Sequence, residues 1–597
     1  MDAVTDPVRP DTSIELGPLT ATFIEGDLFD VRWRGVEVLQ RLYLAVRDEA
    51  WNTIPARFSG FTVDRIGSTA TIEFDATHES GEMSFTWHGT VRATSEGELS
   101  YEMRGRANRD FRYCKIGFNV HHGLESHAGC SFRCRTTDGE YSGVFGADIE
   151  PQLIRDGTLT AMTPHFDRLE VDLPGALVSL DFEGDRFEMQ DHRNWTDANW
   201  KTYGTPLEYG FPMEIGAGTE LYQRITMTVA GPGAGHGADD SVTLQVDSEA
   251  ADRLPRIGHL LTAMPTSAQI ERLRELHPAH VRVNLHPGND IHGRLADAVD
   301  VARELDSHLE VALFIRAESV EDDAATMAEA LVVCPARIAR ILVLLETSGF
   351  SALRGACPPE VADAVLAALS SRGVFGPSVL SGTTQFFADI NRDRPDYSRL
   401  DGIVFAVNPQ VHACDDRSMM QNARGIPPVV DFSRRLYGDI EVVLSPVDLI
   451  GVNGPFPGGP SGDPGRAANE DPRQRSSTGA AWTLAALSEM ARCGVTSVTM
   501  FELVGPRGLM AEEDFKFPVA GLLAHLARLS SSTLVPVRND GPERVAALAF
   551  EQGEAHTMII GNLANAPTHV RLPDGGDLSL PPYGLAHWTE GQVEFVD

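Results

Sequence analysis

The pattern of hydrophobic residues changes near residue 230 and divides the chain into two regions. Up to about residue 230, apolar and polar residues alternate in short runs, as in 69–77, 83–94, 98–107 and 220–229. A period of two is typical of strands that bury one face, and turn-forming residues interrupt the runs roughly every 8–12 residues. The pattern predicts an all-β sandwich, which we assign to residues 1–235.

Beyond this region, almost continuous apolar runs of strand length alternate with amphipathic helix candidates. The strand candidates are 256–263, 280–286, 309–316, 340–347, 374–384, 402–408, 440–446 and 495–502. The helix candidates are 267–277, 293–307, 323–334, 359–372 and 478–494. Such alternation indicates a parallel sheet that is buried on both faces, and eight units predict a (β/α)8 TIM barrel over residues 250–532. A doubly wound sheet is the alternative, but the chain lacks its glycine-rich first turn.

The remaining segments complete a three-domain architecture. Residues 230–241 are rich in glycine, alanine and aspartate, as expected of a linker. Alternating runs return at 544–563, 568–574 and 576–588. They predict a small C-terminal β-sandwich over residues 533–597.

Composition narrows the class of protein. The hydrophobic fraction of 42% is ordinary for a soluble domain, and the formal net charge of −35 argues against a nucleic acid or anionic membrane partner. An acidic proteome explains the charge equally well. There is no apolar run long enough to span a membrane and no secretory signal at the start, so we expect a cytoplasmic protein with seven free thiols.

Candidate catalytic groups follow the predicted barrel strands, because barrel active sites lie at the carboxyl ends of the strands. Glu346 and Glu502 each close an otherwise apolar strand. Partial desolvation there favours acid or base chemistry, although a carboxylate paired with arginine at the rim is an equally simple explanation. Asn391 and Arg392 follow the fifth strand, and the second strand ends near His286.

The sixth strand leads into the most polar of these exits, "NPQVHACDD" at 408–416. Its side chains suit a polyol ligand or an activated water: Asn408, Gln410, His412, Asp415 and Asp416. His412 with either aspartate forms an oriented imidazole base. The alternative is a loop that hydrogen-bonds to itself, with Asp416 capping the next helix.

The segment 187–207 gathers tryptophans and polar groups inside a strand-rich region. We expect it to reach the barrel mouth, where Trp195 or Trp200 forms an apolar floor for a sugar ring. The polar residues expected to bind hydroxyl groups or neighbouring side chains are Asp191, Asn194, Asp197 and Lys201. The alternative is a brace between domains, and the two roles are compatible.

Three segments resemble the D-apionate lactonase family: "QDHRNWTDANWKTYGTPL" (190–207), "FADINRDRP" (387–395) and "NPQVHACDD" (408–416). The resemblance covers nearly the whole chain and includes the three-domain layout. Variants such as Trp200 and Cys414 within these segments leave the substrate open. The resemblance implies hydrolysis of D-apionolactone to D-apionate in the breakdown of apiose, and it supplies no catalytic residues.

Strand-end positions alone give the expected mechanism. One of Glu346 and Glu502 activates a water, and the other, or His412, protonates the leaving oxygen. Asn391, Arg392, Asn408 and Gln410 stabilise the oxyanion or hold hydroxyl groups. We expect no cofactor and no metal, because the histidines and aspartates show no ligand signature. A homo-oligomer is compatible with the sequence.

Two other functions fit the same residues. A glycoside hydrolase would use two barrel carboxylates on a glycosidic bond. A non-catalytic carbohydrate-binding protein would bind sugar without turnover, and it leaves the strand-end glutamates unexplained. A small sugar lactone or glycoside is therefore the expected partner.

Overall fold

The computed structural model describes residues 12–234, 241–247, 253–347, 355–452, 467–511, 517–553, 555–589 and 592–596. Part of the predicted linker, 235–240, and the predicted start of the barrel domain at 250 lie outside these residues. The described chain forms two compact units. One contains 12–193 and 198–234, and the other contains Asn194–Asp197 together with the described residues from 241 onward.

The first unit is a two-sheet β-sandwich, as the alternating pattern predicts. One sheet has the order β1-β2-β3-β4-β9-β17-β16, and β18 also pairs with β9. The other has the order β11-β10-β14-β15-β19-β8-β7-β6-β5. The first sheet comprises β1 (Thr12–Leu16), β2 (Leu19–Ile24), β3 (Asp27–Trp33), β4 (Val36–Asp48), β9 (Phe111–Gly123), β16 (Glu188–Asp191), β17 (Asn199–Tyr203) and β18 (Met213–Ile215). The second comprises β5 (Ala56–Ile66), β6 (Thr69–Ser80), β7 (Met83–Thr94), β8 (Glu98–Ala107), β10 (Ser131–Thr136), β11 (Gly139–Val144), β14 (Phe166–Leu173), β15 (Ala176–Glu183) and β19 (Glu220–Ala230).

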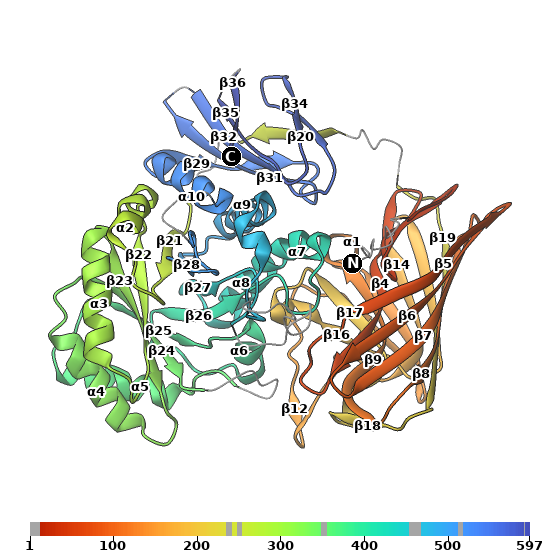
Figure 1. The fold of residues 1–597 in the computed structure, drawn as a ribbon, viewed down its shortest axis with the longest axis horizontal. Helices are drawn as coiled ribbons and strands as arrows, with labels where there is room; N and C mark the ends of the chain where they lie inside the picture. The colour runs from red at the N-terminus through yellow and green to blue at the C-terminus, as the bar shows by residue number, and fades with distance from the viewer. Residues whose placement is uncertain are drawn as a thin grey trace, which may run out of the picture. The chain divides into compact units, whose positions relative to one another are not determined.

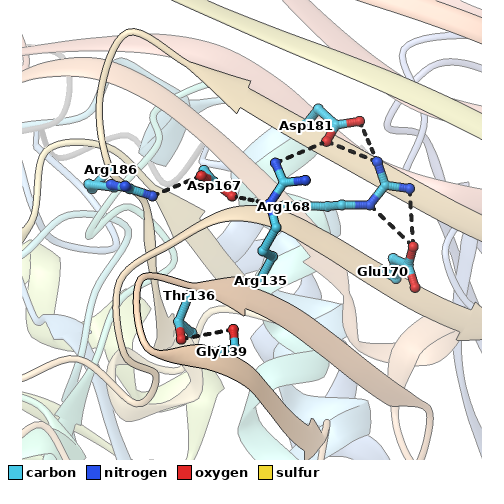
Figure 2. A network of polar contacts seen from close by, with 8 residues as sticks. All are labelled: Arg135, Thr136, Gly139, Asp167, Arg168, Glu170, Asp181 and Arg186. Atoms are coloured by element: carbon cyan, nitrogen blue, oxygen red, sulfur yellow. Dashed lines mark hydrogen bonds and ion pairs between the residues drawn. The ribbon is translucent and has the colours of Figure 1, made fainter.

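The two sheets bury one large apolar core between them, to which Leu42, Phe118 and Tyr101 belong. The outer face of the second sheet is charged. Figure 2 shows a network there, in which Arg168 donates to Asp181 and Glu170, and Arg135 donates to Asp167. Opposite charges on neighbouring strands stabilise a sheet face that meets solvent.

The centre of the first sheet departs from simple alternation, because β4 and β9 are buried on both faces. Side chains of one parity, such as Leu44 and Val120, join the sandwich core. Those of the other parity are mostly polar, and they include Arg41 and His121. Polar side chains on a buried face need hydrogen-bond or ion-pair partners, as Arg41 has in Asp27.

The second unit contains a closed barrel of eight parallel strands in chain order, and helices surround them (Figure 1). The strands are β21 (Arg256–Leu260), β22 (His280–Leu285), β23 (His308–Ile315), β24 (Ile338–Leu345), β25 (Ser378–Gly382), β26 (Gly402–Val407), β27 (Glu441–Val447) and β28 (Ser497–Glu502). Each overlaps one predicted strand, so the prediction of a (β/α)8 barrel is confirmed. The five predicted helices correspond to α2 (Ser267–Leu273), α3 (Ile291–Glu304), α4 (Val320–Val332), α5 (Pro359–Ser371) and α9 (Ser477–Arg492).

Four further barrel helices were not predicted: α6 (Phe387–Asp393), α7 (Asp416–Asn422), α8 (Ile426–Tyr437) and α10 (Pro518–Leu529). Two of them are short, and α8 and α10 have proline in their first turn. Proline is tolerated there because the first amide groups of a helix have no intrahelical acceptor.

The barrel interior follows strand parity. Ala312, Leu342, Leu380 and Val404 form an apolar layer inside the barrel. Glu346 lies four positions after Leu342 on the same parity, so a strand-end carboxylate is directed inward where β24 ends.

A small two-sheet β domain follows the barrel, as predicted. One sheet comprises β29 (Thr533–Val535), β31 (Val545–Gln552), β32 (Ala555–Asn562), β35 (Leu585–Thr589) and β36 (Gln592–Val596). The other comprises β30 (Val537–Asn539), β20 (Ser241–Val246), β33 (Thr568–Arg571) and β34 (Asp577–Leu580). β20 precedes the barrel in sequence and lies parallel to β33, which the sequence analysis did not anticipate.

All seven cysteines are free thiols, as expected. Among the described residues, no helix is both long and apolar enough to cross a membrane.

Candidate active site

Two hollows open at the carboxyl ends of the barrel strands, where barrel active sites lie. The first, called here the β22 hollow, follows β21 and β22, and its lining includes Thr262, Asn284, His286, Asp290 and Arg294. The second, called the β26 hollow, lies at the ends of β25, β26 and β27, and its lining includes Gln385, Phe386, Asn408, Asp448 and Gly451.

Glu346 is paired with an imidazole at the β22 hollow. Its Oε2 lies 2.7 Å from Nδ1 of His286, and the ring of His286 stacks on Phe314 with centroids 4.1 Å apart. The histidine and glutamate side chains are 34% and 30% exposed. A carboxylate on Nδ1 favours the tautomer whose Nε2 accepts protons, so this pair is an oriented base within reach of water.

Glu502 also contacts the β22 hollow. Its Oε2 accepts a hydrogen bond of 2.8 Å from Thr262, and its Oε1 lies 3.2 Å from Nε of Arg507. The residue before it, Phe501, has φ of 58°, a left-handed conformation that side chains other than glycine rarely adopt. Such strain costs about 1–3 kcal/mol and collects at functional sites.

Arg507 joins Glu502 to a second carboxylate. Its Nη2 lies 2.8 Å from Oδ2 of Asp448, which follows β27 and lines the β26 hollow. Burial raises the pKa of Asp448, and the charge of Arg507 opposes that shift. A carboxyl group that holds its proton more tightly is suited to donate it.

The β26 hollow also contains an unused hydrogen-bond donor. The side-chain nitrogen of Gln385 has no partner within the described part of the chain, although the residue is buried. Asn408, two residues past Ala406 on β26, lines the same hollow, as the sequence predicts for a strand-end polar group. Amide donors of this kind can stabilise an oxyanion or hold a hydroxyl group.

The segment Asn194–Asp197 belongs to the barrel unit by its contacts, although both flanking segments belong to the sandwich. Trp195 packs on a small apolar cluster that contains Phe386 and Val411. Asn194 accepts a hydrogen bond of 2.9 Å from Asn391. The predicted proximity of this segment to the barrel mouth is therefore observed for these four residues.

Asp197, and not Asp415 or Asp416, orients His412. Its Oδ2 lies 2.7 Å from Nδ1 of His412, and its Oδ1 accepts from Asn422 at 2.9 Å. The predicted partners are used elsewhere, since Asp415 caps α7 through the Ser418 amide. The sequence prediction of an oriented imidazole stands, but its choice of partner is wrong because a segment distant in sequence supplies the carboxylate.

Several predicted ligand-binding residues bond to other parts of the barrel unit. Asp416 accepts from Arg473 at 2.7 Å, and Gln410 contacts the same guanidinium at 2.6 Å. Arg392 pairs with Asp389, whose other oxygen accepts from Thr383. For Asp416 and Gln410 the partner, Arg473, lies outside the loop 408–416, so these contacts join the loop to another part of the barrel unit.

Three residues of the segment 187–207 lie in the sandwich unit. Asp191 is buried and accepts from Arg193 at 2.6 and 2.9 Å, so its carboxylate has a structural partner. Trp200 is fully buried in the sandwich core, which rules it out as a floor for a sugar ring. Lys201 lies on the polar face of the first sheet, with its Nζ 4.9 Å from the ring centroid of Tyr203.

Sequence reasoning did not single out Asp448, which pairs with Arg507, and it missed Asp197 as the partner of His412. Asp448 follows the seventh strand in the run "SPVDL", and its position just beyond an apolar strand is the same signal that identified Glu346. No local signal links Asp197 to His412, because 215 residues separate them.

Comparisons with known proteins agree with this architecture. Family models described as D-apionate lactonase match in order: the N-terminal domain over residues 2–232, the TIM barrel domain over 259–531 and the C-terminal immunoglobulin-like domain over 542–587. A D-apionate lactonase from Brucella anthropi is 27% identical, and the match covers 96% of each chain.

Solved structures of low similarity also match. A glycoside hydrolase family 30 subfamily 8 xylanase from Clostridium acetobutylicum has a TM-score of 0.39 and 9% identity, over 59% of this chain and 99% of its own. A family 30 endoxylanase from Clostridium papyrosolvens has a TM-score of 0.41 and 10% identity, over 58% and 99%. At this level of similarity, neither match bears on activity.

Proposed function

This chain belongs to the D-apionate lactonase family, and on that premise we propose that it is a hydrolase that opens the lactone ring of D-apionolactone to give D-apionate. This reaction would be one step in the breakdown of the branched pentose apiose. One observation carries the assignment of the site: Glu346 and Glu502 each hydrogen-bond to a residue that lines the β22 hollow.

Hydrolysis of a lactone needs an activated water, stabilisation of the oxyanion and a proton for the leaving alkoxide. We assign the first task to Nε2 of His286, with Glu346 holding its ring. The hydrogen bond between them, 2.7 Å long, stabilises the imidazolium that forms when the water loses its proton. Glu346 then acts as a positioning residue if His286, and not the carboxylate itself, touches the water.

The remaining tasks fall to groups around Arg507 and the β26 hollow. Asp448, whose pKa burial raises, is suited to give a proton to the leaving oxygen, and Glu502 keeps Arg507 in place. The amides of Asn408 and Gln385 are candidates for holding the oxyanion or a hydroxyl group. The pair of His412 and Asp197 is a second candidate acid, and Trp195 a candidate contact for the sugar ring.

Product analysis tests the proposal. The purified protein is incubated with D-apionolactone, with and without a chelator, and the spectrum is followed by NMR against a buffer blank that records spontaneous opening. We expect conversion to D-apionate well above the blank, and the chelator arm tests for a metal requirement. Turnover of aryl glycosides without lactone opening would favour a glycoside hydrolase, and binding without any product would favour a carbohydrate-binding protein.

A further inference from the structure

Polar side chains of β22 form a column inside the barrel that ends at the β22 hollow. Asn284 pairs in register with Ala312 of the interior apolar layer, so its side chain also points into the barrel. Arg282 precedes it by two residues and His286 follows it by two, so all three have the same parity. In an extended strand, Cα atoms two residues apart are about 6.5 Å from each other. Asn284 and the proposed base, His286, therefore lie close together, and both line the hollow.

The amide of Asn284 has a defined orientation. Its Oδ1 accepts a hydrogen bond of 2.9 Å from Nε of Arg282. A guanidinium group only donates hydrogen bonds, so the amide must turn its oxygen, and not its nitrogen, toward Arg282. The NH2 group of Asn284 is therefore directed away from the arginine.

A buried network holds Arg282 in place. Its side chain is 1% exposed, and its Nη1 donates to Oγ of Ser445 at 2.6 Å. Ser445 donates to Oε1 of Glu310 at 2.7 Å, and Thr499 donates to the same oxygen at 2.8 Å. Loss of any of these partners would leave a charged group unsatisfied in the barrel interior, which is strongly unfavourable. The network thus fixes the guanidinium that orients Asn284.

The NH2 group of Asn284 is an unused donor. Among the described residues it has no hydrogen-bond partner, whereas the oxygen of the same amide is bonded. The residue is partly exposed, so the two N–H bonds are left to face the β22 hollow that it lines. The hollow has a volume of about 270 Å³. Drug-sized ligands usually occupy about 300–1,000 Å³, so this volume suits a smaller molecule.

Hydrolysis of a lactone places negative charge on one atom that needs such a donor. Attack joins the water oxygen to the carbonyl carbon, passes a water proton to Nε2 of His286 and leaves the charge on the carbonyl oxygen. When the ring C–O bond breaks, the electron pair returns to the carbonyl bond, and the alkoxide takes a proton from Asp448. Lactone and water thus give the carboxylate and one proton, which is released to solvent. A fixed N–H donor near the base can stabilise the oxyanion.

We propose that Asn284 donates a hydrogen bond from Nδ2 to the carbonyl oxygen of the lactone and to the oxyanion formed from it. The inference rests on the proposed function and adds to it a residue that touches the reacting atoms. Asn408 and Gln385 are the other amide candidates for this role. Asn284 is preferred because its donors share one hollow with the base, whereas the other two line the β26 hollow.

Asn284→Asp tests the inference, because it keeps an oxygen for Arg282 and removes the donors. The carboxylate retains the hydrogen bond and gains an ion pair, so the melting temperature should stay level or rise. In contrast, kcat for D-apionolactone should fall by about 10²–10³-fold, the usual effect of losing one oxyanion donor. A purely structural Asn284 predicts a normal kcat in this variant, and that result would overturn the inference.

Asn289→Asp is the matched control for the added charge. Asn289 lines the same hollow and is exposed. The new carboxylate is screened by solvent and salt there, so kcat should fall by about tenfold at most. A loss equal to that of Asn284→Asp would attribute the effect to charge and overturn the inference.

A binding measurement separates the inference from the proposed function. The lactam analogue of D-apionolactone has a carbonyl oxygen that accepts the same hydrogen bond, and its ring resists hydrolysis. In calorimetric titration, Asn284→Asp should weaken lactam binding by roughly three- to tenfold, the worth of one hydrogen bond. Lactam binding that depends on Asn284, in a protein that does not open the lactone, would remove the proposed function and keep the carbonyl site. Equal affinity in wild type and Asn284→Asp, or no binding by wild type, would overturn the inference.

Discussion

Two carboxylate–imidazole pairs at the carboxyl end of the barrel have the same hydrogen bond and different surroundings. Nδ1 lies 2.7 Å from a carboxylate oxygen in both His286–Glu346 and His412–Asp197. The first pair is about one-third exposed, at 34% and 30%, whereas the second is 11% and 4% exposed. The bond alone therefore does not define a role, and the two pairs differ in their access to water.

The origin of each pair explains this difference. His286 and Glu346 each follow a barrel strand, and the ring of His286 stacks on Phe314 beside the β22 hollow. Asp197 instead comes from the distant segment Asn194–Asp197, where Asn422 binds its second oxygen. The first pair should matter mainly for turnover, and the second mainly for stability.

Loss of the exposed imidazole should have the largest effect. His286→Ala should lower kcat by about 10²–10⁴-fold, the usual contribution of a general base, with little change in melting temperature. Initial rates of D-apionolactone opening and thermal unfolding measure the two. A normal kcat in this variant would show that His286 takes no part in the reaction.

Loss of the buried imidazole should lower the free energy of unfolding. His412→Ala removes the imidazole that lies 2.7 Å from the buried carboxylate of Asp197. This should cost roughly 3–5 kcal/mol of unfolding free energy if the pair is charged and about 1–3 kcal/mol if it is neutral. Urea unfolding measures the change. A large loss of kcat without destabilisation would reverse the two roles.

Gly425 tests how closely the segment Asn194–Asp197 is held. A Cβ at this position would lie 1.9 Å from the carbonyl oxygen of Thr196, so Gly425→Ala must displace that backbone. We expect a loss of about 1–3 kcal/mol in unfolding free energy, as for overpacking elsewhere. Gly146→Ala is the matched control, because the nearest atom to its Cβ is 3.9 Å away. Equal stability of the two variants would contradict close packing.

Full burial of an imidazole should appear as a pH dependence of stability. Burial lowers the pKa of His259 to about 4, and that of His280 likewise to about 4. Between pH 6.5 and 4 the unfolded chain binds more protons, so stability is fully present above pH 6.5 and is lost as pH falls. Each histidine should cost about 1 kcal/mol at pH 5.5.

Unfolding in urea at pH 7.5, 6.5 and 5.5 checks this expectation. His259→Gln should flatten the slope relative to wild type, which separates the histidine from carboxylates that titrate in the same direction. An unchanged slope in the variant would show that His259 does not stay neutral in the folded barrel.

Periodicity was sufficient to predict the fold. The eight apolar runs are long and regular, and each overlaps one barrel strand, because a parallel sheet buried on both faces leaves a continuous signal. The short helices α6 and α7 were missed, since seven residues carry too little helical periodicity. Strand β20 was missed because its partner β33 is more than 300 residues away in sequence.

The site was only partly predictable. Glu346 and Glu502 were identified because a charge at the end of an apolar strand is a local signal. The partners of these residues and of His412 depend on which loops lie close together in the folded chain. The sequence around Asp197 gives no signal of its contact with His412. Asp191 bonds to a neighbouring side chain, Arg193, two residues away in the sandwich, and a role toward a ligand stays a prediction.

The account depends on two acidic groups at the ends of barrel strands, Glu346 and Glu502, which hold His286 and Arg507 in place for lactone hydrolysis. The most direct test is the kcat/KM of Glu346→Gln and Glu502→Gln for D-apionolactone, with the exposed Glu329→Gln as control. We predict a fall of at least ~100-fold in both site variants, with melting temperatures near wild type and an unaffected control. Turnover within twofold of wild type in both site variants would contradict it.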